Sequence, residues 1–380
     1  MNSFPAVDPI PLPAPVWLMK VLHVVTLSLH FVAVEILLGG LLIAAILSVS
    51  GHGTYARHAA GAMARRLPIV MTYVINFGVP PLLFAQVLYG RALYTSSVLL
   101  GAWWIGVVFL LMACYWLLYQ FSERIEAGKT AWPAGLASWI LAGGIAQILT
   151  GNMTLMLRPE AWAAMYERSA VGAHLPSGDP TMMPRFFFML AGGLMTGGIW
   201  MLYLSGRSVF AKEMKGYLSA LGGRIATVAA AATIGLAFLV VNRQPEAVRS
   251  GLADHPLYSI SGYAWLALAA LILAAAAMAG LGKHQSAFTT LGAPLLTVLA
   301  MIAMTVYRDG IRDLSLLQKG FDVWQRTEVS NWSVIGLFLL LFVTGLGVIA
   351  WLISVVAKAA KHQEGPGPVL ESGKMMKGAA

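Results

Sequence analysis

The stretch that decides the fold is residues 17–49, WLMKVLHVVTLSLHFVAVEILLGGLLIAAILSV, in which Lys20 and Glu35 are the only charged side chains. About 20 apolar residues suffice to cross the roughly 30 Å of hydrocarbon in a bilayer. This stretch is long enough to do so with a tilt, or to project beyond the membrane. It predicts a first transmembrane helix.

The composition of the whole chain agrees with a membrane protein. Of 380 residues, 58% are hydrophobic and 11% are charged, whereas soluble domains are about 25% charged. The net charge of +9 does not indicate nucleic-acid binding, because the basic residues are scattered between apolar segments. A single cysteine, Cys114, excludes a disulfide within the chain, a haem c attachment motif and a thiolate iron–sulfur cluster.

The apolar runs predict about nine transmembrane helices, and they show no alternation typical of membrane strands. The fold class is therefore all-α, a polytopic membrane helix bundle. The Lys and Arg bias of the loops places the N-terminus outside. The spans are expected at approximately 17–49, 67–90, 95–121, 132–156, 185–205, 219–241, 257–281, 287–307 and 332–356.

Three segments are expected along the chain. Residues 1–16 form a Pro-rich lead-in without the basic start of a signal peptide, and residues 17–358 form the transmembrane domain. Residues 359–380 are expected to be a disordered cytoplasmic tail. The larger loops, 157–184, 242–256 and 308–331, fall on the outer side and suggest a structured cap.

Beyond Lys20 near its start, the first span holds three ionisable residues, which are costly inside a membrane and therefore candidates for function. His23 and His30 lie two helical turns apart, roughly 10 Å along one face. Glu35 points to a different face. The histidines are candidates for haem ligation or a proton relay, and the alternative is that they hold neighbouring helices by hydrogen bonds. All other histidines fall in loops or the tail, so the chain cannot alone build a transmembrane bis-histidine haem site.

The second span contains two consecutive prolines, Pro80 and Pro81, near Asn76 and Gln86. Two prolines interrupt the backbone hydrogen bonds of a helix. They indicate either a bent helix that lines a cavity or a purely structural kink.

Several polar residues are expected at the outer ends of the spans. Asn152 and Thr154 are followed by Arg158, and the eighth span ends in VYRDGIRD. A basic ring there would suit haem propionates or another anion, although single arginines at an interface also snorkel. The candidate members are Arg308, Asp309 and Arg312, with Arg185 and Arg243.

Read in order, several stretches resemble subunit I of the cytochrome bd-type quinol oxidases. They are LHFVAVEILLGGLLIAAILSVSG, YVINFGVPPLLFAQVLYG, SWILAGGIAQILTGNMTLMLRPEAW and PRFFFMLAGGLMTGGIWML. No single motif is specific, but the order is collinear and covers most of the chain. The resemblance implies a bacterial cytoplasmic (inner) membrane protein of a respiratory chain.

The resemblance implies that His30 is an axial ligand of a b-type or related haem, with His23 nearby, and that Lys20 contacts haem propionates. At other positions this sequence differs from the residues that the family has. The second haem's histidine falls on Phe188, its methionine falls near Gly262, and a conserved glutamate appears as Gln86. The third span has no carboxylate between Arg91 and Ser122.

These departures imply an oxidoreductase subunit that keeps at most one haem and acts with a redox partner. That partner would be another membrane subunit or a cytochrome c, with quinol a possible substrate. Two alternatives stay open: a haem-free scaffold subunit of such a complex, and a small-solute or ion transporter with Pro80–Pro81 as a broken helix and Glu35 as coupling residue.

Overall fold

The protein is an all-α membrane helix bundle. The computed structural model describes residues 11–51, 53–282 and 286–363. Within these ranges nine helices are long and apolar enough to cross a membrane, which confirms the expected number. Helices pair most of their backbone groups internally, as a lipid environment requires.

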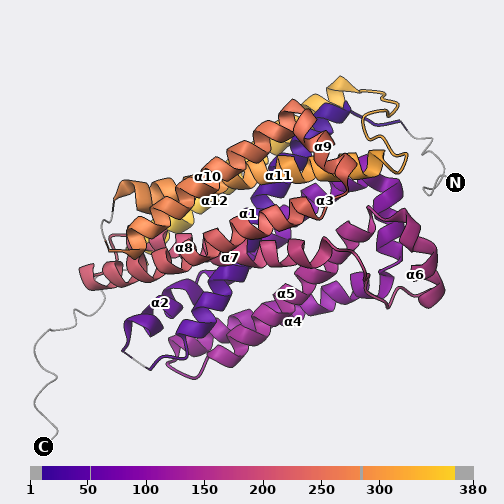
Figure 1. Ribbon diagram of the computed structural model, residues 1–380. Coiled ribbons are helices and arrows are strands. Elements are labelled where there is room, and N and C mark those ends of the chain that lie inside the picture. Colours follow the sequence, from indigo (N-terminus) through magenta and orange to yellow (C-terminus); the bar gives the residue numbers. More distant parts are fainter. Residues whose placement is uncertain (1–10, 52, 283–285, 364–380) are drawn as a thin grey trace, which may run out of the picture.

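Two groups of four long helices make up the bundle, and a ninth helix stands beside them (Figure 1). The first group comprises α1 (Val16–Leu47), α3 (Leu67–Val98), α4 (Gly101–Glu126) and α5 (Trp132–Leu155). The second group comprises α7 (Met182–Ser205), α8 (Lys212–Asn242), α10 (Pro256–Gly280) and α11 (Ala293–Leu317). A π-helical turn, η2 (Phe288–Gly292), leads into α11.

Short elements cover the two ends of the bundle. The turn η1 (Pro159–Ala161), α6 (Trp162–Arg168) and α9 (Glu246–Asp254) lie at one end, and α2 (Tyr55–Ala64) lies at the opposite end (Figure 1). At the first end, the lead-in is joined to the loop before the last helix. Leu12 donates its backbone N–H to Thr327 O at 2.8 Å and accepts from Val329 N at 2.9 Å.

Helix α1 joins the two groups, because it packs against α3 and α5 on one side and against α7 and α11 on the other. Its contact with α7 depends on glycine. A Cβ atom on Gly39 would lie 1.7 Å from the carbonyl oxygen of Gly193, so only the absence of a side chain lets the two backbones meet. Small residues allow this kind of close approach between membrane helices.

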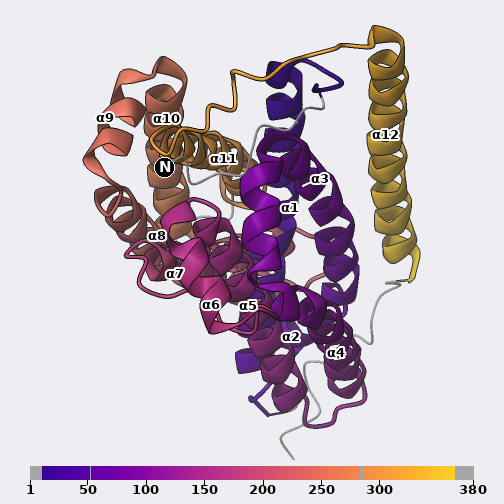
Figure 2. The same ribbon diagram turned by 90° about the vertical axis from the view of Figure 1, so that its right-hand side faces the viewer.

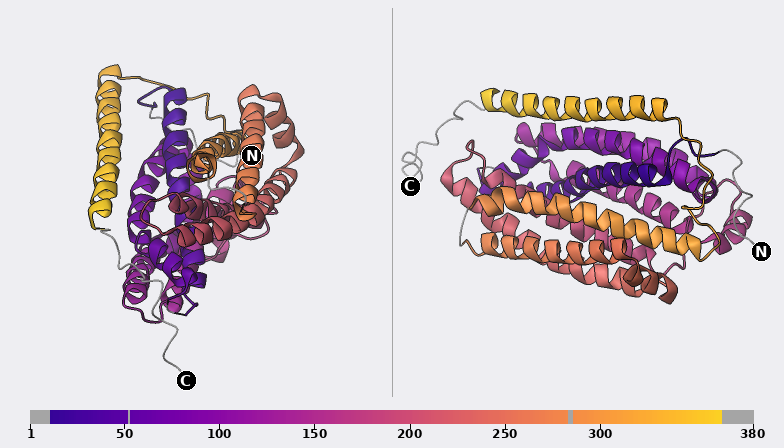
Figure 3. Two further views of the ribbon diagram at one scale, coloured as in Figure 1. Left: turned by 90° about the vertical axis from the view of Figure 1, so that its left-hand side faces the viewer. Right: turned by 90° about the horizontal axis from the view of Figure 1, so that it is seen from above.

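The ninth helix, α12 (Trp332–Gln363), runs along the outside of the first group. Figures 2 and 3 show it separated from the other helices along most of its length. Its start is anchored, since Ile335 packs against Leu18 and Leu22 of α1. Most of its large side chains beyond that point are exposed, as expected of residues that face lipid or another chain. Residues 364–380 of the expected tail, and residues 1–10 of the lead-in, lie outside the described residues.

The boundaries of several expected spans were wrong. The eighth span does not end at 307, because α11 continues to Leu317 and carries the charged RDGIRD stretch as helix. The second span continues past residue 90 to Val98, through both prolines and a non-helical residue at Tyr89. The third span begins only at Gly101 and extends to Glu126 rather than 121.

Candidate functional site

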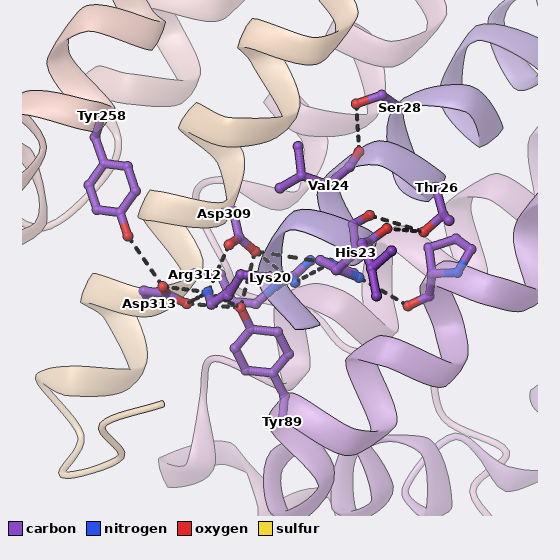
Figure 4. A network of polar contacts seen from close by, with 12 residues as sticks. Lys20, His23, Val24, Thr26, Ser28, Tyr89, Tyr258, Asp309, Arg312 and Asp313 are labelled. Atoms are coloured by element: carbon purple, nitrogen blue, oxygen red, sulfur yellow. Dashed lines mark hydrogen bonds and ion pairs between the residues drawn. The ribbon is translucent and has the colours of Figure 1, made fainter. Parts of the chain in front are cut away.

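Two carboxylates on α11 form the centre of a buried group of charges. Asp309 and Asp313 lie four residues apart, on one face of the helix. Lys20 of α1 reaches both: its Nζ lies 2.7 Å from Oδ2 of Asp309 and 2.5 Å from Oδ2 of Asp313 (Figure 4). The hydroxyl of Tyr89 on α3 lies 2.6 Å from the same Nζ. All four side chains are buried, so the contacts connect α1, α3 and α11 inside the protein.

Arg312 and His23 extend this group. One nitrogen of Arg312, Nη1, lies 3.2 Å from Oδ1 of Asp309 and 2.9 Å from Nε2 of His23. A guanidinium can only donate, so Nε2 accepts and the proton of a neutral His23 sits on Nδ1. Nδ1 then donates to the carbonyl oxygen of Pro81 at 3.1 Å. Both ring nitrogens of His23 are therefore engaged. We define the charged cluster as Lys20, His23, Tyr89, Asp309, Arg312 and Asp313.

Two further side chains, one from α10 and one from the loop after α11, contact the cluster at Asp313. Oδ2 of Asp313 accepts from the hydroxyl of Tyr258 on α10 at 3.2 Å, and from Nε1 of Trp324 in the following loop at 3.3 Å. Within the cluster, the charges of Lys20 and Arg312 balance those of the two aspartates. Buried charges are tolerated where pairing and hydrogen bonding are this complete, and losing one partner is costly.

Two further arginines lie beside the cluster. The guanidinium of Arg308 stacks 5.4 Å above the ring of Phe31, and its buried Nη1 has no hydrogen-bond partner among the residues that the structure describes. The positive charges of Arg312 and Arg185 act on the guanidinium of Arg308. The negative charge of Asp179 acts on Arg185. Three of the predicted basic residues therefore gather between α1, α7 and α11.

Arg243, the remaining candidate for the basic ring, and Arg158, expected at the same outer level, lie apart. Arg243 is exposed at the end of α8. Arg158 lies near Glu160 and Asp179, with Nε–O distances of 3.4 Å and 3.8 Å. Both are outside the charged cluster.

His30 and Glu35 occupy separate surroundings further along α1. His30 is half-buried and faces α3, where its Nδ1 lies 3.0 Å from the carbonyl oxygen of Val74. Glu35 is buried and faces α7, where its Oε2 accepts from the hydroxyl of Thr196 at 2.7 Å. The structure does not bring these two residues together with each other or with the cluster.

Two predicted polar residues, Asn152 and Gln86, lie on helices of the first group. Asn152 is fully buried on α5, and its Nδ2 donates to the hydroxyl of Ser97 on α3 at 3.2 Å. Gln86 is half-buried on α3. Asn76, beside the prolines, is exposed and bonds the Thr72 carbonyl of its own helix. Two cavities, one beside α4 and one between α1 and the second helix group, are lined by helices other than α3.

The sequence reasoning missed two members of the cluster. Asp313 carried a usable signal, because it follows Asp309 by four residues and Arg312 by one in the RDGIRD stretch. Tyr89 carried none, since a tyrosine in an apolar run is ordinary packing material. Only the three-dimensional arrangement shows that its hydroxyl meets both Lys20 and Asp309.

The residues proposed for haem do not fit that cofactor well. His23 has no free ring nitrogen, and the ammonium of Lys20 is surrounded by Asp309, Asp313 and Tyr89. At the family's second haem, Phe188 instead packs 5.9 Å from Trp265 between ring centres. A side-chain carbon at Gly262 would lie 2.8 Å from the ring of Tyr307, so that position is filled by an aromatic residue. His30 keeps an uncommitted Nε2 among the hydrogen bonds described.

Comparison with known proteins gives a structural relative but no sequence relative. No protein-family model matches the chain, and no curated protein matches it. Among solved structures, the fold is similar to one chain of the bd oxidase from Geobacillus thermodenitrificans, with a TM-score of 0.65 and 14% sequence identity. The match covers 93% of this chain and 100% of that chain. The chain therefore shares a bd-oxidase-like membrane fold at a sequence identity of 14%.

Proposed function

We propose that this chain is a scaffold subunit, without a haem of its own, of a cytochrome bd-like redox complex in a bacterial cytoplasmic membrane. Two observations support membership in such a complex. The fold resembles that of a bd oxidase chain over almost the full length, and the sequence stretches that resemble subunit I occur in collinear order. The partner is then a second membrane subunit that carries the haem and oxidises quinol.

The scaffold role rests on one observation: Lys20 and His23, which the resemblance implies as haem contacts, are already bonded to other protein groups. His23 is bonded to Arg312 and to α3, and Lys20 is bonded to two aspartates of α11. A haem propionate or a haem iron would have to displace these partners, leaving buried charges unpaired at a cost of several kcal/mol. In the present arrangement the same residues hold the two helix groups together.

One specific observation favours a second candidate, a single haem bound by His30. Its Nδ1 lies 3.0 Å from the carbonyl oxygen of Val74, so the neutral ring donates from Nδ1 and leaves a lone pair on Nε2. Histidines that ligate metals usually hold their second nitrogen in this way. His30 would then supply the axial ligand, and the chemistry at the iron would be electron transfer. Equally, the same hydrogen bond holds α1 against α3 without any cofactor.

Purification of the affinity-tagged chain from its own membranes in mild detergent tests the proposal. We expect a complex with a reduced-minus-oxidised haem spectrum, in which the haem stays with the partner polypeptide when the subunits are separated. A chain that purifies without a haem-bearing membrane partner would contradict the complex. Haem that remains with this chain would contradict the scaffold role and support the second candidate.

A further inference from the structure

Glu35 lies deep within the bundle, twelve residues beyond His23 on α1 and so about 18 Å further along the helix axis. Its side chain is buried, with an exposed fraction of 5%. One carboxyl oxygen, Oε2, accepts a hydrogen bond from Thr196 on α7. The other, Oε1, lies against the backbone of α7, where a Cβ atom on Gly192 would approach it to 2.5 Å. The glycine leaves the room that this carboxyl group occupies.

A small cavity adjoins the carboxyl group, at the seam between α1 and the second helix group. Its volume is about 20 Å³, and Glu35 shares its wall with the hydroxyl-bearing residues Thr233 and Thr297. The rest of the wall is apolar and includes Phe188, Trp265 and Met301. This volume suits one water molecule, and a carboxyl group with two hydroxyls offers the two to four polar partners that a buried water needs.

Among the described residues, none that lines this cavity carries a positive charge. The wall residues from α7, α8, α10 and α11 are apolar, Thr or Gly. On α1 itself, His30 faces α3 and is bonded there. Arg308 of α11 stacks on Phe31, one helical turn from Glu35 on α1, and Arg185 of α7 lies beside Arg308. Neither arginine lines the cavity.

A buried carboxylate without a counter-ion is far less stable than the neutral acid, because the charge has lost its hydration. Asp309 and Asp313 avoid this cost by pairing with Lys20 and Arg312. Glu35 has one neutral hydroxyl donor instead. Two kinds of buried carboxyl group therefore coexist in one protein, and the surroundings of Glu35 favour the form that carries a proton.

We propose that Glu35, Thr196 and a water molecule in the adjoining cavity form a proton-binding site at the seam between the two helix groups. The Glu35 carboxylate takes a proton from hydronium, giving the carboxylic acid and water, and the reverse step returns the proton. Thr196 donates to Oε2 in both forms, so the proton is exchanged at Oε1 beside Gly192. This site does not depend on the proposed role in a redox complex.

Labelling with a hydrophobic carbodiimide, dicyclohexylcarbodiimide, tests the proposal on the intact detergent-solubilised chain. The reagent adds to protonated carboxyl groups, and mass spectrometry of peptides locates the product. We expect label on the peptide that contains Glu35 and none on the peptide that contains Asp309 and Asp313, which serves as the internal control. Label on Glu35 should be lost as the pH is raised, because the reactive form is the protonated one.

Two variants and one ion complete the design. Glu35→Gln should abolish the label while the protein stays monodisperse, and Thr196→Val, which removes only the hydroxyl, should extend labelling to higher pH. The proposal would be overturned by labelling that does not change with pH, or by equal labelling of Asp309 and Asp313. It would also be overturned if Na⁺, compared with choline at equal ionic strength, protected Glu35, since that outcome identifies a cation site.

Discussion

His23 and His30 make equivalent hydrogen bonds from α1 to α3. They lie seven residues apart, and the carbonyl oxygens that face their Nδ1 atoms, those of Pro81 and Val74, also lie seven residues apart in the reverse direction. The two contacts therefore fix α1 and α3 in one antiparallel register. Seven residues are two helical turns, which explains why both rings reach the same neighbouring helix.

The two histidines should differ in how much they stabilise the fold. His23→Ala removes a buried bond to α3 and leaves Arg312 without its acceptor, so we expect a loss of about 2–3 kcal/mol, near the upper end for a buried group left unsatisfied. His30→Ala removes one bond at a half-buried site and should cost about 1 kcal/mol. Thermal unfolding of both variants in one detergent checks the order. Equal losses would contradict the different roles assigned to them.

Of the charged residues, Lys20 should be the one whose substitution lowers the stability of the fold most. Lys20→Met leaves two buried aspartates facing each other, and breaking a buried ion pair from one side typically costs about 3–5 kcal/mol. Lys319→Met is the matched control, because Lys319 pairs with Glu160 at 3.3 Å on a partly exposed surface, where such pairs contribute about 1 kcal/mol or less. Both are followed by thermal unfolding. Asp313→Asn in the Lys20→Met background should recover part of the loss.

Arg308 and Arg312 lie one helical turn apart on α11, but replacing each by methionine should change the stability of the fold differently. Arg312→Met removes a partner of both Asp309 and His23, and we expect a loss of several kcal/mol. Arg308→Met removes a guanidinium whose Nη1 has no hydrogen-bond partner within the described part of the chain, so the unfolding temperature should stay unchanged or rise. A large loss with Arg308→Met would show that Arg308 has a partner that the described contacts do not contain.

The contact between α1 and α7 should tolerate no side chain at Gly39. Gly39→Ala places a carbon within 1.7 Å of the Gly193 carbonyl oxygen, and the helices must separate, at a cost of about 1–3 kcal/mol or more. Gly235→Ala on α8 is the control and should be neutral, because no described atom outside the surrounding helix turn lies within 4 Å of the added carbon. Similar unfolding temperatures for both variants would contradict the close packing.

Hydropathy predicted the architecture because membrane helices differ from loops in composition. The same criterion misplaced the end of the eighth span, because it treats Arg308, Asp309, Arg312 and Asp313 as a boundary. Lys20 pairs with Asp309 and Asp313 from another helix, and no scale that scores residues one at a time can represent pairing.

The candidate site was predictable only in part for the same reason. Lys20, His23, Asp309 and Arg312 were each suspect as ionisable residues in or near a span, and the structure brings these four together. Their mutual engagement favours a structural role over the haem contacts that the family resemblance implies. Tyr89, at the centre of the cluster, gave no signal in the sequence.

The central claim is that this chain binds no haem of its own. The most direct measurement is a titration of the purified, folded chain with haem, followed by visible spectroscopy and pyridine haemochrome quantification, for the wild type and His30→Ala. The account predicts that neither protein retains a stoichiometric haem after gel filtration. A wild-type chain that retains about one haem, with His30→Ala retaining none, would contradict it and assign His30 as the ligand.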